Sequence, residues 1–216
     1  MQQIGAVGKQ DWQDRPCYIV GGGPSLKPHS KKLWLLYQRG FVLAVNDSYK
    51  NCYFPDAIFS LDHLWLEKNL SNFKDMPGPV FVAVSEDNPR FERENLTYLH
   101  RQYRPSGNPK NLLSEDPSII WNGMNSGFGA LNFAYLKGAK TIYLLGFDFK
   151  EINDQTHFHA GYAWHNRLGS NLMFPKWAQA FDDTVEQLGS RGVQVFNCSD
   201  NSLLTCFPHK PYEEVL

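Results

Sequence analysis

Cys17-Tyr-Ile-Val-Gly-Gly-Gly-Pro-Ser25 carries the strongest information about the architecture of this chain. Four strand-forming residues run directly into three glycines, and an amphipathic segment around Leu33, Trp34 and Leu36 follows. A buried strand that ends at a glycine turn before a helix is typical of the first unit of a doubly wound α/β sheet.

The same alternation of strand-like and helix-like segments continues along the chain. Strands are expected over 41–46, 57–62, 80–85, 141–148 and 193–197, and helices over 30–38, 64–71, 126–138 and 175–189. Two long polar loops, 101–123 and 150–174, interrupt the pattern, and loops of such length are usually functional. We therefore predict one α/β domain over 1–216, with its core at about 17–204. Its sheet is expected to be Rossmann-like, doubly wound and mostly parallel, with helices on both faces and both loops over the crevice.

Composition excludes several classes of protein. Hydrophobic residues make up 42% of the 216 residues and the net charge is −1, so no basic field predicts nucleic-acid binding. No signal peptide and no run of about 18–20 apolar residues is present, which favours a cytoplasmic protein without a membrane span. The four cysteines form no C-x-x-C pair, and Cys17 and Cys198 are expected to be small core residues.

The glycine turn is expected to bind phosphate. Gly21, Gly22 and Gly23 allow close approach of a ligand, and the N–H groups at the following helix N-terminus attract an anion. Pro24 rules out the dinucleotide fingerprint, and Ser25 adds a hydroxyl donor. The alternative is a glycine-rich turn between strand and helix that binds no ligand.

Polar residues follow the other predicted strands at the same edge. They are Asn46 and Asp47, Asp62, and Gly146 with Asp148, while Asn125-Ser126-Gly127 precedes a helix rich in small residues. We predict that these residues contact a nucleotide. Capping of the adjacent helices or turns is the alternative for Asn46, Asp47, Asp62 and Ser126.

Three histidines lie within nine residues of the second long loop. His157, His159 and His165 are candidate general acids or bases, with Asp148 as a further catalytic candidate. Lys150 and Arg167 would stabilise a leaving phosphate. A metal site from Asp154 and the first two histidines is an alternative without a specific signature, and solvated loop histidines are another.

The order of these motifs resembles a known superfamily. Gly-Gly-Gly-Pro-Ser-Leu, Val-Asn-Asp, Asn-Ser-Gly, Ile-Tyr-Leu-Leu-Gly-Phe-Asp-Phe and Asn-Cys-Ser-Asp-Asn-Ser-Leu-Leu follow one another over about 17–204. The series is similar to that of 6-hydroxymethylpterin diphosphokinase-like proteins and small bacterial sialyltransferases. Compact members of the first group are frequent in bacteriophage genomes, as the resemblance suggests.

The resemblance implies roles for particular residues. In the sialyltransferases the glycine turn and the Asn after the second strand contact the nucleotide, which corresponds to Gly21–Ser25 and Asn46. Ser126-Gly127 would lie at the same nucleotide, and Gly146 to Phe149 match the Gly-x-Asp-Phe motif. Two departures stand out, since Lys150 replaces a phosphate-binding tyrosine and no histidine occupies 174–175, where the general base is expected. The nearest histidine is His165.

Three functions follow from these observations. The first is a nucleotide-dependent transferase, moving a sugar from a nucleotide-sugar to a small-molecule or glycan acceptor. The second is diphosphate transfer from ATP to a hydroxymethyl group, which requires Mg²⁺ and makes Asp47, Asp62 and Asp148 candidate ligands. The third is a non-catalytic nucleotide sensor. The abundant aromatic residues leave room for homo-oligomer formation.

Overall fold

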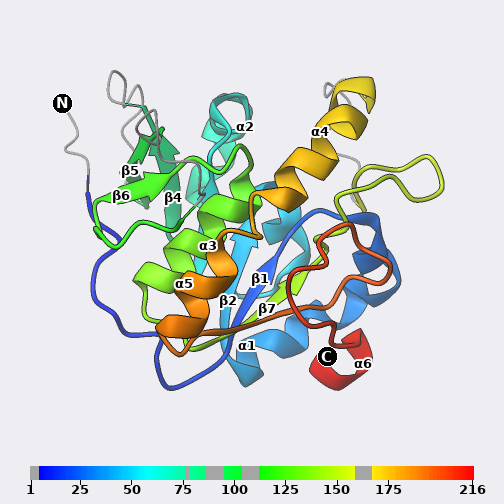
Figure 1. Ribbon diagram of the computed structural model, residues 1–216. Helices are drawn as coiled ribbons and strands as arrows, with labels where there is room; N and C mark the ends of the chain where they lie inside the picture. Colours follow the sequence, from blue (N-terminus) through cyan, green and yellow to red (C-terminus); the bar gives the residue numbers. More distant parts are fainter. Residues whose placement is uncertain (1–4, 76–77, 86–94, 104–111, 159–166) are drawn as a thin grey trace.

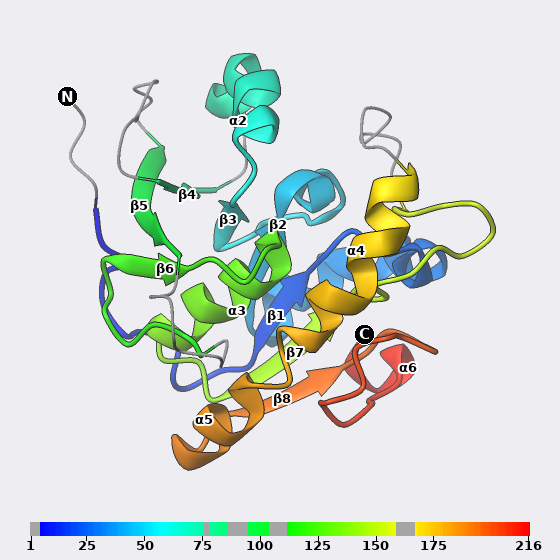
Figure 2. The same ribbon diagram turned by 45° about the horizontal axis from the view of Figure 1, so that its top comes forward.

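One parallel sheet organises the computed structural model, which describes residues 5–75, 78–85, 95–103, 112–158 and 167–216. Within these residues the sheet has eight strands, all paired in parallel, in the order β6-β5-β4-β3-β2-β1-β7-β8 (Figure 2). They are β1 (Cys17–Val20), β2 (Phe41–Val45), β3 (Ala57–Ser60), β4 (Val80–Val84), β5 (Leu96–Gln102), β6 (Ile119–Trp121), β7 (Thr141–Leu145) and β8 (Gln194–Asn197). The predicted α/β fold with a doubly wound sheet is confirmed.

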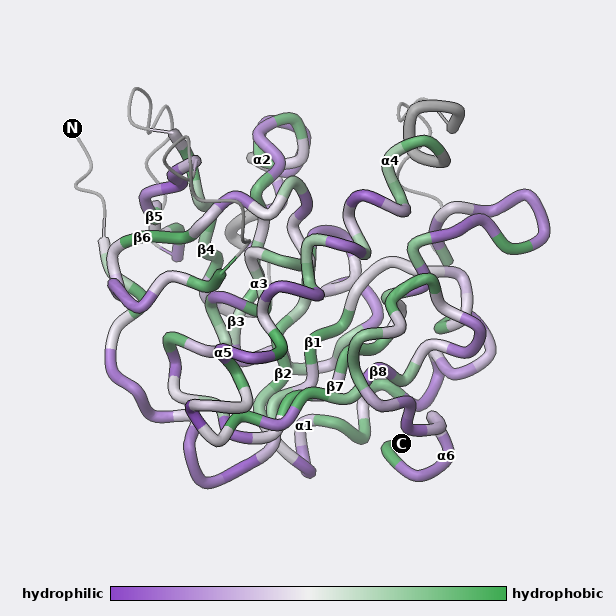
Figure 3. The backbone as a smooth tube through the Cα atoms, in the orientation of Figure 1, coloured by the Kyte–Doolittle hydropathy of each residue, from purple (hydrophilic) through white to green (hydrophobic). Residues whose placement is uncertain are grey.

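The strands are apolar on both faces because helices cover both faces (Figure 1). Cys17 and Ile19 of β1 pack in one core with α3 (Ser126–Leu136) and α5 (Thr184–Ser190). Tyr18 and Val20 pack in the other core. That core also contains side chains of α1 (Leu36–Arg39), α2 (His63–Asn69), α6 (Tyr212–Val215) and the 3-10 helices η1 (Pro24–Leu35) and η2 (Asn46–Asn51). In Figure 3 the hydrophobic residues gather along the strands and the polar ones in the outer loops.

The segment after β1 differs from the expected helix over 30–38. It forms the twelve-residue 3-10 helix η1, and α1 adds a single α-helical turn of four residues. Pro28 lies inside this segment, and because proline has no N–H to donate and its ring crowds the preceding turn, it disfavours a regular α-helix there. A second 3-10 helix, η3 (Leu70–Asp75), extends α2.

Two strands were missed in the sequence. β5 covers 96–102 and β6 covers 119–121, so the expected loop over 101–123 includes the end of β5 and all of β6. β5 ends in His100, Arg101 and Gln102, whose polar side chains hide its strand character.

The expected helix over 175–189 is two helices. α4 (Arg167–Gln179) contains Pro175 in its interior, and α5 starts at Thr184. The helical segment therefore begins eight residues before the expected start, at Arg167 rather than at Pro175. The loop after β7 is correspondingly shorter than 150–174.

The cysteines behave as expected. Cys17 and Cys198 are fully buried, all four cysteines are free thiols, and burial raises the pKa of Cys52 to about 12. Among the described helices, none has the length and apolar character needed to cross a bilayer.

Candidate functional site

A cavity of about 700 Å³ opens at the carboxyl ends of the strands. Its position follows from the topology. The chain runs from β1 to its neighbour β2 on one side of the sheet, and from β7 to its neighbour β8 on the other side. The loops after β1 and β7 leave the sheet in different directions there, and ligands of doubly wound folds bind at such a switch point. The volume is in the range of ligand pockets of about 300–1,000 Å³.

Most of the predicted site residues line this cavity. They are Gly21, Gly22, Gly23, Asn46, Asp62, Asn125, Ser126, Gly127, Gly146, Asp148, Phe149, Lys150 and His157. Pro24, Ser25 and Asp47 are not part of its lining. His159 and His165 lie outside the described residues.

Three of the N–H groups at the glycine turn are engaged within the chain. Gly21 N–H donates to Leu145 O (2.7 Å), and Gly23 N–H donates to Gly146 O (2.8 Å). Ser25 N–H donates to Asp148 Oδ2 (3.2 Å). These donors are therefore satisfied within the chain, and the carboxylate of Asp148 takes the place expected for an anion. The turn contributes a bare backbone wall that a ligand can approach closely.

Asp148 is a structural partner of that turn as well as a cavity residue. Its side chain is almost fully buried, and its Oδ1 atom has no hydrogen-bond partner. Burial raises the pKa of the Asp148 carboxyl, although hydrogen bonds from Ser25 and the charge of Lys150 act in the opposite direction. The carboxyl is thus easier to protonate in the folded protein than in the unfolded chain.

This shift predicts a pH dependence of stability. A raised folded pKa contributes stability that is fully present below the unfolded pKa and is lost as pH rises through the folded pKa. The difference in free energy of unfolding between wild type and Asp148→Asn should therefore move against the wild type as pH rises above about 4, the pKa of the unfolded chain. Urea unfolding of both proteins across this range measures it. A difference that moves toward the wild type as pH rises would contradict the raised pKa.

Asn46 and Asp47 have separate tasks although they are neighbours. Asn46 has a left-handed backbone (φ 52°), which asparagine tolerates, and its buried Oδ1 has no partner. Asp47 accepts a hydrogen bond from Trp65 Nε1 (2.8 Å) and pairs with Lys50 (3.0 Å). Asn46 is thus available to a ligand, whereas Asp47 holds α2 and η2 together.

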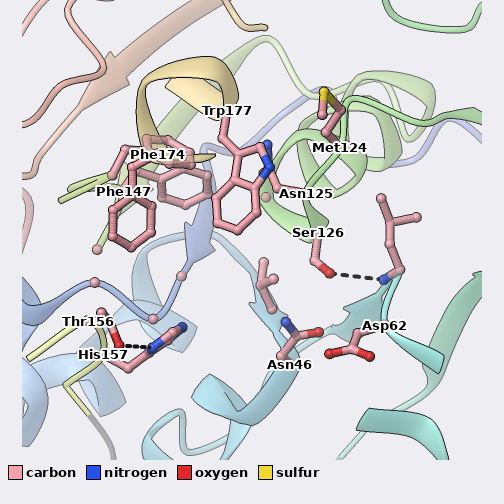
Figure 4. Close-up of a pocket in the computed structure, with 18 of the residues that line it drawn as sticks. Asn46, Asp62, Met124, Asn125, Ser126, Phe147, Thr156, His157, Phe174 and Trp177 are labelled. Carbon is pink, nitrogen blue, oxygen red and sulfur yellow. Dashed lines mark hydrogen bonds between the residues drawn. The ribbon is translucent and has the colours of Figure 1, made fainter. Parts of the chain in front are cut away.

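Helix capping, the alternative role of these polar residues, accounts for several of their hydrogen bonds at the other strand ends. Asp62 Oδ1 accepts from the N–H groups of Leu64 and Trp65 at the start of α2. Asn125, rather than Ser126, caps α3 by accepting from Phe128 N–H (2.9 Å). Ser126 Oγ instead accepts from Leu61 N–H (3.1 Å; Figure 4), which ties the start of α3 to the end of β3.

The glycines of α3 allow close packing. A Cβ on Gly129 would lie 2.7 Å from the Phe59 ring, and one on Gly127 would lie 2.7 Å from the Phe147 ring. These positions therefore need glycine for packing, whatever the ligand.

His157 is the predicted histidine that the structure brings to the cavity. Its Nδ1 lies 3.0 Å from Thr156 Oγ1, a contact that fixes the ring (Figure 4). Lys150 and Phe149 follow β7 on the cavity wall, and Phe149 has a left-handed backbone (φ 49°). Among the described residues no group of three or more His, Cys, Asp or Glu side chains could hold a metal ion.

Sequence reasoning missed an aromatic wall and one cation. Phe174 and Trp177 of α4 line the cavity together with Phe147 (Figure 4), and Trp177 Nε1 is buried without a partner. The spacing Phe174-x-x-Trp177 places both rings on one side of a helix, a signal hidden by the misplaced helix start. Arg101, Tyr103 and Met124 also line the cavity.

The helix boundary changes one sequence argument. Positions 174–175, where a catalytic histidine was expected just before the last large helix, lie inside α4. The residues that precede α4 in the sequence are His165 and Asn166. The absence of a histidine at 174–175 therefore carries no weight against a histidine base, and the role of His165 stays a prediction.

Two solved structures resemble this chain to different degrees, and the first of them supports the fold. The MAf glycosyltransferase from Magnetospirillum magneticum AMB-1 has a similar structure over 100% of this chain, with a TM-score of 0.62 and 16% identity. The chain spans only 35% of that protein. The sialyltransferase Cst-II Y81F in complex with CMP aligns over 90% of this chain and 85% of its own, with a TM-score of 0.47 and 17% identity. No curated protein sequence matches the chain.

The family of this protein is assigned from its sequence rather than from its structure. The model of the family described as 6-hydroxymethylpterin diphosphokinase MptE-like matches residues 3–154, which is well over half of the chain. The matched range includes β1 to β7, and with them the glycine turn, Asn46, Asn125 to Gly127 and the strand end at Asp148. The protein therefore belongs to the 6-hydroxymethylpterin diphosphokinase MptE-like family.

Proposed function

We propose that this protein is a nucleotide-dependent transferase that uses the cavity to bind the nucleotide of a nucleotide-sugar donor. The observation that carries the proposal is the convergence of buried, unpaired polar atoms on this cavity. Asn46 Oδ1, Asp148 Oδ1 and Trp177 Nε1 belong to residues that line it, which lie after β2, after β7 and in α4. An unpaired buried polar group costs about 1–3 kcal/mol, so three in one place indicate a ligand that supplies their partners.

The aromatic wall suits a nucleobase. Trp177 and Phe174 have ring centroids 5.6 Å apart at an interplanar angle of 71°, an edge-to-face arrangement that fixes both rings. A base stacked on one of these rings gains about 1–3 kcal/mol whatever its identity. The indole N–H and the Asn46 side chain then supply polar contacts to the base or the ribose.

The phosphates are expected beside Lys150 rather than on the N–H groups of the glycine turn. Lys150 lies on the cavity wall after β7, and its ammonium group provides a point charge for a leaving phosphate. The raised pKa of Asp148 limits repulsion from that carboxyl. The backbone wall of Gly21 to Gly23 leaves space for the phosphates to pass.

His157 is the candidate base for transfer. In the proposed step it removes the proton from an acceptor hydroxyl, and the hydroxyl oxygen forms a bond to the anomeric carbon of the sugar. The bond from that carbon to the phosphate oxygen breaks, and the nucleotide leaves with both bonding electrons. The contact between Thr156 and the Nδ1 atom orients the ring for this task.

The family description supports diphosphate transfer from ATP as the second candidate. Mg²⁺ would then need carboxylates beside the phosphates. Asp47 is engaged by Trp65 and Lys50, so it is not available. Asp62 Oδ1 accepts from the N–H groups of Leu64 and Trp65, and Asp148 Oδ2 accepts from Ser25 N–H, so both carboxylates are also engaged within the chain. The predicted set of three aspartates therefore does not fit a common magnesium site.

Titration calorimetry with CMP, UDP, GDP and ATP, each with and without Mg²⁺, tests the proposal. We expect at least one nucleotide to bind without Mg²⁺. Trp177→Ala should weaken that nucleotide about 5- to 150-fold, the loss of about 1–3 kcal/mol of stacking. Trp177→Phe should recover part of the loss, because it restores the ring without the N–H group.

Trp34→Ala is the matched control, since the Trp34 side chain is exposed and is not part of the cavity lining. It should leave nucleotide binding unchanged. No binding of any nucleotide at millimolar concentration, or equal affinities of wild type and Trp177→Ala, would contradict the proposed site. Binding that requires Mg²⁺ and ATP favours diphosphate transfer. Tight binding without release of nucleotide from any nucleotide-sugar favours the sensor.

A further inference from the structure

Arg101 is a charged side chain in the cavity that the nucleotide does not explain. It lies near the end of β5, and its Nη1 donates to Leu61 O (2.9 Å) while its Nε is buried without a partner. No carboxylate forms an ion pair with it in the part of the chain that the structure describes. Asp62, the next residue after Leu61, turns Oδ1 to the N–H groups of α2 instead.

The orientation of the guanidinium is fixed by backbone contacts. Leu61 N–H donates to Ser126 Oγ (3.1 Å), and Leu61 O accepts from Arg101, so this one residue links the start of α3 to β5. With Nη1 held, the edge formed by Nε and Nη2 is the one left for a ligand. Two parallel N–H groups along that edge match the oxygens of a carboxylate or a phosphate.

This edge and Lys150 belong to different parts of the cavity wall. Arg101 reaches the carbonyl after β3, while the glycine turn follows β1, two strand spacings or about 10 Å away. Lys150 follows β7, one strand further. The backbone positions that carry the two cations therefore follow different strands of the sheet, which favours separate anionic groups of the ligand as their partners.

We infer that Arg101 binds an anionic group, a carboxylate or a phosphate ester, on the sugar or acceptor that lies beside the nucleotide. The inference rests on the proposed function for the identity of the cavity as a substrate site. It makes Arg101 a residue that determines substrate specificity, since a neutral substrate would leave the buried Nε unpaired.

Binding of three matched monosaccharides tests this role. Glucuronate, glucose 6-phosphate and glucose share a ring and differ in the anion, and their dissociation constants can be measured by ligand-observed NMR. At least one of the two anions should bind wild type at least tenfold more tightly than glucose. Arg101→Gln should abolish this preference, and Arg101→Lys should retain only part of it, because lysine keeps the charge but lacks the planar edge.

Arg39→Gln is the matched control, because Arg39 Nη1 also donates to a backbone carbonyl, that of Val215 (3.2 Å), and is not part of the cavity lining. It should keep the preference for the anion. Equal binding of all three sugars to wild type, no measurable binding of either anion, or a preference that survives Arg101→Gln would overturn the inference.

The nucleotide panel on the same variants separates this inference from the proposed function. A loss in Arg101→Gln that is confined to the anionic sugars supports it, and an equal loss for nucleotide and anions contradicts it. If no nucleotide binds to wild type while the anion preference depends on Arg101, the anionic subsite stands and the nucleotide proposal fails.

Discussion

Gly23→Ala should lower the free energy of unfolding by about 2–4 kcal/mol. The backbone of Gly23 is extended (φ −67°, ψ 148°), so alanine is excluded by lack of space rather than by conformation. An added Cβ would overlap Asp148 Oδ2 and lie 2.6 Å from Gly146 O. Relief of the overlap would break the Gly23–Gly146 hydrogen bond or the contact between Ser25 and Asp148.

Gly189→Ala is the control for this substitution. Gly189 lies in α5, and nothing within 4 Å would meet its Cβ, so alanine should be neutral or should stabilise the helix by up to about 1 kcal/mol. Urea unfolding of both variants gives the comparison. If Gly23→Ala is as stable as wild type, the close packing of the glycine turn against Asp148 is not a property of the folded protein in solution.

The same residue illustrates what sequence could predict about the site. Three glycines after a strand predicted a turn at the carboxyl edge of a parallel sheet, and the turn does line the cavity. The sequence did not reveal that the partner of the turn is Asp148, 123 positions after Ser25. Long-range pairing of this kind leaves no local pattern, because it depends on how β1 and β7 are placed side by side.

The fold was easier to predict than the walls of the cavity, for a physical reason. Strands buried on both faces are apolar throughout, and β1, β2 and β7 stand out clearly. By contrast, β5 ends in polar residues, and Arg101 is one of them. In the same way, α4 has a proline between Phe174 and Trp177. Residues that face a ligand depart from core patterns, so the missed elements are those that carry the missed site residues.

Asn132→Leu should have the largest effect on stability, a loss of about 3 kcal/mol or more. Asn132 of α3 is fully buried, and its Oδ1 accepts from Ser114 N–H (3.0 Å) and Trp121 N–H (3.1 Å). Its Nδ2 donates to Ser114 O (3.1 Å). Leucine has similar volume but satisfies none of these three backbone groups, and each costs about 1–3 kcal/mol when it is left unpaired away from water.

Gln187→Leu provides a control on the same segment of chain. Gln187 of α5 accepts from Leu113 N–H (2.7 Å) and donates to Leu113 O (3.0 Å), so it makes the same kind of contact one residue earlier. Because Gln187 is only half-buried, water can replace its hydrogen bonds, and the loss should be near 1 kcal/mol. Urea unfolding measures the loss in free energy of unfolding for both variants. Equal losses would show that burial does not determine the cost of removing these hydrogen bonds. Asn132 also holds the end of β6, next to Asn122 on the cavity wall. Asn132→Leu, but not Gln187→Leu, should therefore also weaken nucleotide binding.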